Sequence, residues 1–467
     1  MIKKLSQNLI NILGYNIIQI DEIEKIINDT NKLSGLDRLK ISKKLIKKYP
    51  NIPFFYLIAA ESLHWQCDPE KFEYFNKYGE IRQTWLKENN LEQLNLDFIW
   101  NGMFTGSLGN HFPVESLINA RRTKLIKNKN FFSVIGKKNK PRNYKLYQMF
   151  KKYINFIEDN HISSSISGLE KILTLPLGFC VPLEKECPYL DLASNVTQNE
   201  LVKQNKNINI FEKNDLLLNS AADNFKKFAI DKNSWFVTLH MREPYYRGEN
   251  AFNTTEDWRN TNINTYLKAI QYIISKGGYV FRMGDKNSTP LPSIEGLVDY
   301  AHSELKSEEM DVYLGSRNKF CIASSSGYYH IPMFFGNPVL FTNSPLFIEY
   351  YGLREHDFYI PRMIKNDHEN KIINFKEFSN KYNSIRTSKD HFGKSNISVI
   401  ENSEDEILHS VKEINESLDN KKFEETKLQT KFKNIISMNT SDYLINGIIP
   451  KANISSYFAD KYKELIN

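Results

Sequence analysis

The sequence predicts an α/β fold with parallel sheets, and this prediction depends mainly on the stretch 235–343. Three apolar runs there are rich in aromatic and β-branched residues, which is the composition of buried strands. They are 235–243 (WFVTLHMRE), 277–285 (GGYVFRMGD) and 319–332 (KFCIASSSGYYHIP). Between the first two lies 255–278, which is polar at its start, amphipathic in its middle and ends in glycine, as helices do. Strands that alternate with helices predict a parallel sheet.

The domain organisation follows from changes in this pattern along the 467 residues, a length that allows two or three domains. Residues 1–90 place apolar side chains at helical spacing and are similar to helix-turn-helix repeats of the tetratricopeptide sort. We expect a first Rossmann-like domain at 91–202, a second at 215–400 and C-terminal helices at 401–467. The two domains should face each other across a cleft, and the final helices should pack back towards the first domain.

The first Rossmann-like domain is expected to open with a strand at 94–104, a loop at 105–113 (TGSLGNHFP) and then a helix. This loop is not GxGxxG and lacks the Walker lysine, which excludes dinucleotide-binding proteins and P-loop NTPases. Its glycines allow a ligand to approach the backbone closely. The candidate site residues of the loop are Gly106, Ser107, Gly109 and Asn110. The next strand is expected at 131–136, and 144–157 is expected to be one helix.

Composition and charge limit the class of protein. Hydrophobic residues make up 41% of the chain, which is typical of a globular protein, and the net charge is +7. The basic residues are spread out, so they favour an anionic ligand or a membrane surface only weakly. We find no nucleic-acid-binding module and expect no nucleic-acid partner. Four cysteines without a CxxC spacing indicate a reducing compartment, the cytoplasm.

The sequence contains no apolar run of the ~20 residues that a membrane-spanning helix requires. A different kind of membrane contact stays open at the N-terminus. Lys3 and Lys4 precede Leu9, Ile10 and Leu13, a pattern that could form a helix lying on a membrane surface. The expected location is therefore the cytoplasm, with peripheral association at the inner face of the cytoplasmic membrane as the alternative.

Polar residues follow the three predicted strands of the central stretch at the point where each strand ends. Because residues two apart in a strand project from the same face, the histidine and arginine of the first strand end should point the same way. Ligands of open α/β sheets bind beyond the carboxyl ends of the strands, and the planar fork of arginine suits phosphate. The strand-end residues are His240, Arg242, Arg282, Ser324, Ser325, Ser326 and Gly327. Together they predict one anion-binding crevice.

Two more candidates lie just before the first turn of the helix predicted at 255–278. Arg259 and Asn260 are placed where backbone N–H groups favour anions. Each candidate also has an ordinary interpretation when it is taken alone. An arginine at a strand end can be a surface charge, a serine-rich turn can be a helix N-cap, and His240 can be a satisfied core histidine.

The motifs of the central stretch resemble, as a set, a bacterial family of glycosyltransferase-like proteins from surface-polysaccharide gene clusters. The motifs are LHMRE, WRNTNINTYLKAI, GGYVFRMGD, VDYAHSELKSEEMDVYL and KFCIASSSGYYHIPMFFGNPV. Members of that family often carry tetratricopeptide-like helices at the N-terminus. More distantly, the His-x-Arg strand end and the serine loop resemble the donor-phosphate motifs of fucosyltransferases with the GT-B architecture.

This resemblance implies a GT-B-like fold and transfer of a sugar from a nucleotide sugar to a glycan or a lipid-linked acceptor. It implies that Arg242 and the serines 324–326 hold the donor diphosphate and that 247–253 lies near the sugar. The loop 105–113 would lie on the acceptor side. No cofactor is implied beyond the nucleotide sugar, which is a co-substrate.

Glycosyl transfer also requires stabilisation of the leaving diphosphate and, in an inverting enzyme, a carboxylate base. Arginines, serines and a helix N-terminus can replace a metal ion at the diphosphate. The sequence has no Asp-x-Asp motif, so we expect no bound metal. Glu243 and Glu249 follow the His-x-Arg pair, and either could be the base. The alternative for both is a loop carboxylate that pairs with Arg242 or Arg247.

Two other functions stay open from the sequence. A sugar-nucleotide epimerase on the same fold would bind the same diphosphate but would need no acceptor. A non-catalytic assembly protein would use the N-terminal helices to bind a partner. The retained Arg242, Arg282 and serine loop count against the second of these.

Overall fold

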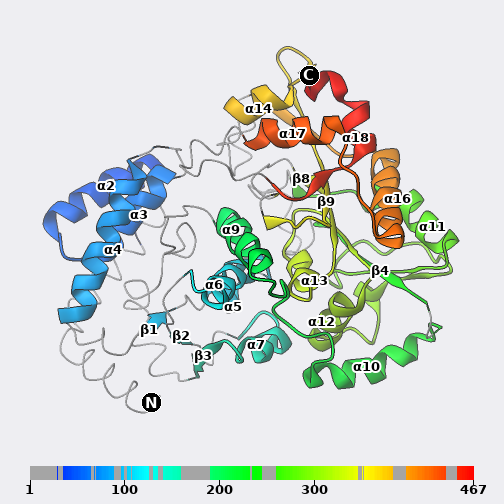
Figure 1. Cartoon of the computed structure of the whole chain (residues 1–467), viewed down its shortest axis with the longest axis horizontal. Coiled ribbons are helices and arrows are strands. Elements are labelled where there is room, and N and C mark those ends of the chain that lie inside the picture. Colours follow the sequence, from blue (N-terminus) through cyan, green and yellow to red (C-terminus); the bar gives the residue numbers. More distant parts are fainter. Residues whose placement is uncertain are drawn as a thin grey trace. The chain divides into compact units, whose positions relative to one another are not determined.

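The structure is a computed structural model of the 467-residue chain, which divides into two compact units, Met1–Ala193 and Ser194–Asn467 (Figure 1). The described residues are 29, 35–64, 68, 70–88, 96–98, 102–106, 108–125, 130–134, 140–158, 190–231, 234–243, 259–344, 350, 352–381, 396–437 and 450–466.

The first unit begins with three packed helices, α2 (Gly35–Lys48), α3 (Pro53–His64) and α4 (Lys71–Glu88). α3 is apolar on every side, and Phe55 and Ile58 on it are fully buried. A helix of this kind needs neighbours on more than one side, and α3 packs against both α2 and α4. The expected N-terminal helical segment is confirmed over these residues, whereas its likeness to tetratricopeptide repeats stays a prediction.

A three-stranded parallel sheet follows in the order β1-β2-β3, with β1 at Leu96–Phe98, β2 at Asn130–Val134 and β3 at Ile154–Ile157. The helical elements between these strands are α5 (Gly102–Thr105), the 3₁₀ turn Leu108–His111, α6 (Phe112–Arg122) and α7 (Tyr144–Phe150). The strand expected at 94–104 is therefore wrong at its end, because 102–105 is helical.

The single helix expected at 144–157 is also wrong. The Asn143 side chain accepts a hydrogen bond from the Leu146 backbone N–H and caps α7, but the helix ends at Phe150. Beyond a turn, Ile154 is buried and Asn155 is exposed, which is the alternation of a strand. This second half pairs with β2 as strand β3.

The second unit is built on a seven-stranded sheet in the order β13-β9-β8-β7-β4-β5-β6, in which every neighbouring pair is parallel. Its strands are β4 (Phe236–His240), β5 (Tyr279–Arg282), β6 (Leu297–Val298), β7 (Cys321–Ala323), β8 (Val339–Ser344), β9 (Phe358–Pro361) and β13 (Asn453–Ile454). The central strands are buried along nearly their whole length, as expected of a parallel sheet covered on both faces. The predicted α/β fold class is thereby confirmed.

The helices of the second unit connect or flank its strands. They are α9 (Leu190–Lys203), which spans the boundary between the units, α10 (Asn219–Phe225), α11 (Leu267–Ser275), α12 (Glu308–Arg317), α13 (His330–Phe334), α14 (Phe375–Lys381), α16 (Glu404–Asn420), α17 (Lys427–Ser437), α18 (Ser456–Lys461) and α19 (Lys463–Ile466). A small antiparallel sheet joins β10 (Met363–Asn366) to β11 (Lys371–Ile372) and β12 (Ile397–Ile400). Among the helices that the structure describes, none is both long and apolar enough to cross a bilayer.

The C-terminal segment belongs to the second unit. α16 packs against α11, β8 and β9, and Figure 1 shows α16 beside α11. Buried Glu406 accepts hydrogen bonds from Lys461 Nζ and the Tyr462 hydroxyl, each at 2.6 Å, and so ties the last helices to α16. These helices pack on the seven-stranded sheet and on one another, and the expectation that they also pack back towards the first domain stays a prediction.

One aromatic cluster in this core offers a test of the fold. The Phe281 ring on β5 is fully buried and lies 5.0 Å from the Phe236 ring and 5.2 Å from the Phe228 ring. Phe281→Ala should lower the free energy of unfolding of the second unit by about 3–5 kcal/mol, because it leaves a cavity. Leu216→Ala, at a side chain that is 80% exposed, should change it by less than about 0.5 kcal/mol. Urea unfolding followed by tryptophan fluorescence measures both, and equal effects would contradict this core.

Candidate functional site

The order in which the chain adds strands to the sheet of the second unit reverses between β4 and β7. The chain runs from β4 to β5 and β6 on one side, and then returns to β7, β8 and β9 on the other side. In open α/β sheets, ligands bind in the crevice at such a switch point, beyond the carboxyl ends of the strands. The register pairs His240 with Ala323 at the ends of these two strands. The segments that follow, 241–243 and 324–327, therefore leave the sheet next to each other.

Ser324 joins the two strand ends. Its backbone N–H donates to the His240 carbonyl oxygen at 3.1 Å, and its hydroxyl oxygen accepts from the Arg242 backbone N–H at 2.9 Å. The Ser324 side chain is fully buried. Its observed role is thus to hold the residue after the first strand against the residue after the third, and its predicted contact with phosphate stays a prediction.

Arg259 crosses to the serine loop from a different segment of the chain. Its Nε donates to the Ser325 hydroxyl at 2.9 Å, and one of its terminal nitrogens donates to the Ser325 carbonyl oxygen at 2.8 Å. Two residues later, the Thr261 backbone N–H donates to the Arg242 carbonyl oxygen at 2.9 Å. Arg242, Arg259, Ser324 and Ser325, predicted from three separate stretches, therefore lie together at the switch point.

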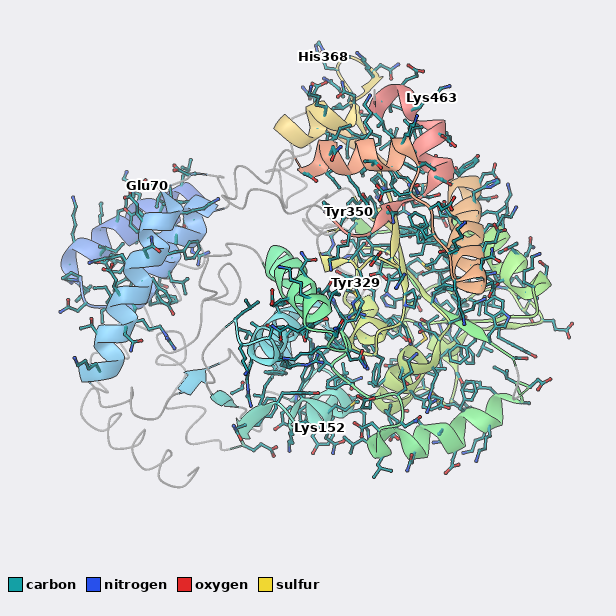
Figure 2. The ribbon with its side chains drawn as sticks, in the orientation of Figure 1. Glu70, Lys152, Tyr329, Tyr350, His368 and Lys463 are labelled. Atoms are coloured by element: carbon teal, nitrogen blue, oxygen red, sulfur yellow. The ribbon has the colours of Figure 1, made fainter. Side chains whose placement is uncertain are left out.

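The helix after the serine loop is short. Half-exposed Ser326 precedes a 3₁₀ turn, Gly327–Tyr329, which continues into the five-residue α13. So short a helix supplies little of the positive potential that we expected from its N-terminus. Tyr329, labelled in Figure 2, packs its ring 4.9 Å from the ring of Phe341 on β8.

The helix expected at 255–278 is described from Arg259 onwards. It begins with a 3₁₀ turn, Ile263–Tyr266, and continues as α11 from Leu267. Arg259 and half-buried Asn260 therefore lie before the helix, as predicted, and Asn262 caps its first turn. The Asn260 carbonyl oxygen accepts a hydrogen bond from Arg362, a residue that we did not single out from the sequence.

Arg282 is fully buried inside a network of carboxylates. Its terminal nitrogens donate to Glu243 Oε2 at 2.6 Å, to Asp299 Oδ1 at 3.0 Å and to the Thr289 carbonyl oxygen at 2.9 Å. The second Glu243 oxygen accepts from the Thr289 backbone N–H at 3.2 Å. To bind phosphate, Arg282 would have to give up these carboxylate partners. To act as a base, Glu243 would have to give up the hydrogen bonds that it accepts from Arg282 and Thr289. Their roles in chemistry stay predictions, whereas their contacts here fix the chain that follows β4 and β5.

Asp299 is the member of this network that the sequence did not assign. Besides Arg282, it accepts hydrogen bonds from the Leu291 backbone N–H at 3.0 Å and contacts His302 Nδ1 at 2.9 Å. Its only sequence signal was its place in the motif VDYAHSELK, directly after the residues that form β6. Among the described residues, no group of three or more His, Cys, Asp or Glu side chains is arranged to hold a metal ion.

His240 lies at the end of β4 with its ring stacked on Tyr328, the ring centroids being 5.2 Å apart. Burial, reinforced by the nearby charges of Arg282 and Lys306, lowers the pKa of His240 to about 3. Its Nδ1 is buried and has no hydrogen-bond partner among the residues that the structure describes. His240 is therefore neutral at pH 7 and can offer a ligand a hydrogen bond but not a positive charge.

The remaining candidates fall in the first unit or outside the described residues. Gly106 follows α5 and Gly109 lies in the 3₁₀ turn Leu108–His111, both half-buried. Ser107, Glu249, the side chain of Asn110 and the stretch 247–253 lie outside the described residues. The cleft expected between the two domains, and the acceptor side assigned to this loop, stay predictions.

No protein family matches this sequence, and no curated protein matches it significantly. Two solved structures are similar to parts of the chain. The glycosyl transferase family 9 from Veillonella parvula DSM 2008 has a TM-score of 0.35 at 11% identity, over 57% of this chain and 85% of that chain. TibC, an iron-containing dodecameric glycosyltransferase from enterotoxigenic E. coli H10407, has a TM-score of 0.26 at 11% identity, over 53% of this chain and 57% of that chain. Both TM-scores lie below 0.5, so neither likeness assigns a function.

The lowered pKa of His240 predicts a pH dependence of stability. In the unfolded chain His240 takes up a proton near pH 6.5, but in the folded protein it does so only near pH 3. Its contribution to stability is thus fully present above pH 6.5 and is lost as the pH falls towards 3. Between pH 6.5 and 5, wild type should lose up to about 2 kcal/mol more than His240→Gln in urea unfolding. If NMR titration shows His240 gaining a proton near pH 6.5, the prediction that its ring stays neutral in the folded protein is wrong.

Proposed function

We propose that this protein is a glycosyltransferase that moves a sugar from a nucleotide sugar to a glycan or lipid-linked acceptor. The observation that carries the proposal lies at the switch point of the parallel sheet, where the Arg259 guanidinium donates to Ser325 and the Arg242 backbone N–H donates to Ser324. The resemblance of the motifs around these residues to glycosyltransferase-like proteins supports the same activity. A place in surface-polysaccharide synthesis, in the cytoplasm or at its membrane surface, follows from that resemblance.

Glycosyl transfer requires a site with hydrogen-bond donors that face the leaving diphosphate. In glycosyl transfer, the bond between the anomeric carbon and the diphosphate oxygen breaks, and a bond from an acceptor oxygen to that carbon forms. Negative charge develops on the leaving diphosphate, and fixed donors that face it stabilise the transition state more than the ground state. Arg242, Arg259, Ser325 and Ser326 are the residues we assign to this task. Each donates through N–H or O–H groups, and arginine can contact two phosphate oxygens at once.

The acceptor loses a proton, which a carboxylate would take in an inverting enzyme. Both oxygens of Glu243 accept hydrogen bonds from Arg282 and the Thr289 backbone. We therefore assign the base first to Glu249 and give Glu243 the task of holding the segment after Arg242. No cofactor takes part in this scheme, in which the nucleotide sugar is consumed as a substrate.

The first test of this proposal is a comparison of ligands. Arg242→Ala and Arg259→Ala should each weaken binding of a nucleoside diphosphate about ten- to a hundredfold, because a charge-assisted hydrogen bond contributes roughly 1.5–3 kcal/mol. Binding of the bare nucleoside should change little. Isothermal titration across a panel of nucleoside diphosphates measures this. Arg317→Ala, at a site on α12 that contacts Asn214, is the matched control and should bind like wild type. Equal losses for nucleoside and diphosphate would show that both arginines are structural.

The second test concerns the metal. If arginines and serines hold the diphosphate, EDTA should leave turnover of the donor unchanged, and Ser325→Ala with Ser326→Ala should raise the apparent dissociation constant of the donor. Activity lost in EDTA and restored by magnesium or manganese would contradict the metal-free site and point to Asp257, Asp285 and Asp299 as candidate ligands. Turnover of the nucleotide sugar that needs no acceptor would instead indicate an epimerase.

A further inference from the structure

Among the described residues, three arginines besides Arg242 lie at the carboxyl edge of the sheet, namely Arg259, Arg282 and Arg362. The sequence motifs assigned no role to Arg362. Arg362 follows β9, and its backbone N–H donates to the carbonyl oxygen of Ser344 at the end of β8 at 3.0 Å. Its side chain is only 3% exposed. The carboxylate of Glu401, one residue beyond β12, lies 3.7 Å from it.

Arg362 and Glu401 enclose the three residues that follow Arg259. One terminal nitrogen of Arg362 donates to the Asn260 carbonyl oxygen and, at 3.2 Å, to the Thr261 hydroxyl. Glu401 Oε2 accepts from the Asn262 backbone N–H at 3.1 Å. A donor and an acceptor of opposite charge thus hold successive residues of one segment, 260–262.

Both residues are themselves anchored on the sheet. Asn402, next to Glu401, exchanges two hydrogen bonds with Asn343 on β8, one from each backbone N–H to the other side-chain oxygen, at 2.7 and 2.8 Å. The Asn402 side chain also donates to the carbonyl oxygen of Pro361, the residue before Arg362, at 2.7 Å. Arg362 and Glu401 are therefore held at the ends of β8 and β9, two adjacent strands that do not lead into the serine loop.

We propose that Arg362 and Glu401 form a clamp that positions Arg259 over the serine loop and thereby sets the affinity for the donor diphosphate. This inference rests on the proposed function, because it assigns the clamp's effect to a diphosphate site. The clamp holds 260–262. Within this segment, the Thr261 backbone N–H donates to the Arg242 carbonyl oxygen. Arg259, the residue directly before the clamped segment, donates to Ser325 in the serine loop. Neither clamp residue needs to touch the ligand, so both are positioning residues. A guanidinium held in place before binding loses less conformational entropy when the ligand arrives.

A double-mutant cycle tests the clamp with inorganic pyrophosphate as the ligand. Glu401→Gln and Arg362→Ala should each weaken pyrophosphate binding about tenfold in titration calorimetry, within the range of couplings between residues in contact. In the Arg259→Ala background the same changes should have almost no further effect, because the clamp acts through Arg259. Arg362→Lys keeps the charge but has a single nitrogen, and should fall between wild type and Arg362→Ala. Fully additive losses would overturn the proposal.

Hydrogen exchange provides a measurement that does not depend on the ligand. In Glu401→Gln, the backbone amides of Thr261 and Asn262 should exchange faster than in wild type, while amides of β4 and β7 should not change. The control is Asp405→Asn. It removes the exposed ion pair of 2.9 Å between Asp405, in the first turn of α16, and Lys268 on α11. It should alter neither exchange at 260–262 nor pyrophosphate binding.

Pyrophosphate titration and hydrogen exchange together distinguish a failure of the proposed function from a failure of the clamp. If wild type binds neither pyrophosphate nor any nucleoside diphosphate, the proposed function is wrong and the effect on affinity falls with it. If exchange at Thr261 and Asn262 is unchanged in both Glu401→Gln and Arg362→Lys, the clamp itself is wrong, whatever the ligand. Arg362 is buried and Arg362→Ala can unfold the protein, but Glu401 is 35% exposed, so Glu401→Gln keeps the test available.

Discussion

The site of the second unit depends on the parallel pairing of β4 with β7. These strands are neighbours in space although β5 and β6 lie between them in the sequence. Because their register brings His240 and Ala323 to the same level, the two following segments meet at one edge of the sheet. Ser324 then extends the pairing by one hydrogen bond and adds a second through its hydroxyl. Without this pairing, the arginine after the first strand and the serines after the third would have no reason to be near each other.

Arginines at this edge serve two different purposes. Arg282 is fully enclosed by Glu243 and Asp299, and a guanidinium removed from water in this way requires carboxylate partners to offset its lost hydration. Such a network contributes to the structure mainly by fixing the positions of the segments that carry Arg282, Glu243 and Asp299. Arg259, in contrast, donates to the neutral hydroxyl and carbonyl oxygen of Ser325. These two hydrogen bonds hold the Arg259 guanidinium against the serine loop, where the proposed function requires a cation.

A layer of contacts outside the site supports this arrangement. The ends of β8 and β9 hold Asn402 and Arg362, and these residues hold the segment 260–262. That segment is far from both strands in the sequence, so its position is set by folding of the whole unit. The anion site that we propose would therefore be sensitive to substitutions that lie outside it, unlike a phosphate loop formed by consecutive residues.

The sequence alone determined the α/β class and three central strands of the second unit. β4, β5 and β7 all lie within the apolar runs that predicted them, because strands covered on both faces must be apolar throughout. It also indicated Arg242, Arg282 and the serines as one group, since parallel strands end at the same edge, and it placed Arg259 separately, just before a helix. It did not separate α7 from β3, because a short apolar run fits either a helix or a strand and only the pairing with β2 decides. Nor did it reveal the partners of Arg282 or the position of Arg362. Glu243 and Asp299 meet Arg282 only because β4, β5 and β6 are adjacent in the sheet, and hydrogen bonds across such distances are set by tertiary packing rather than by any local pattern.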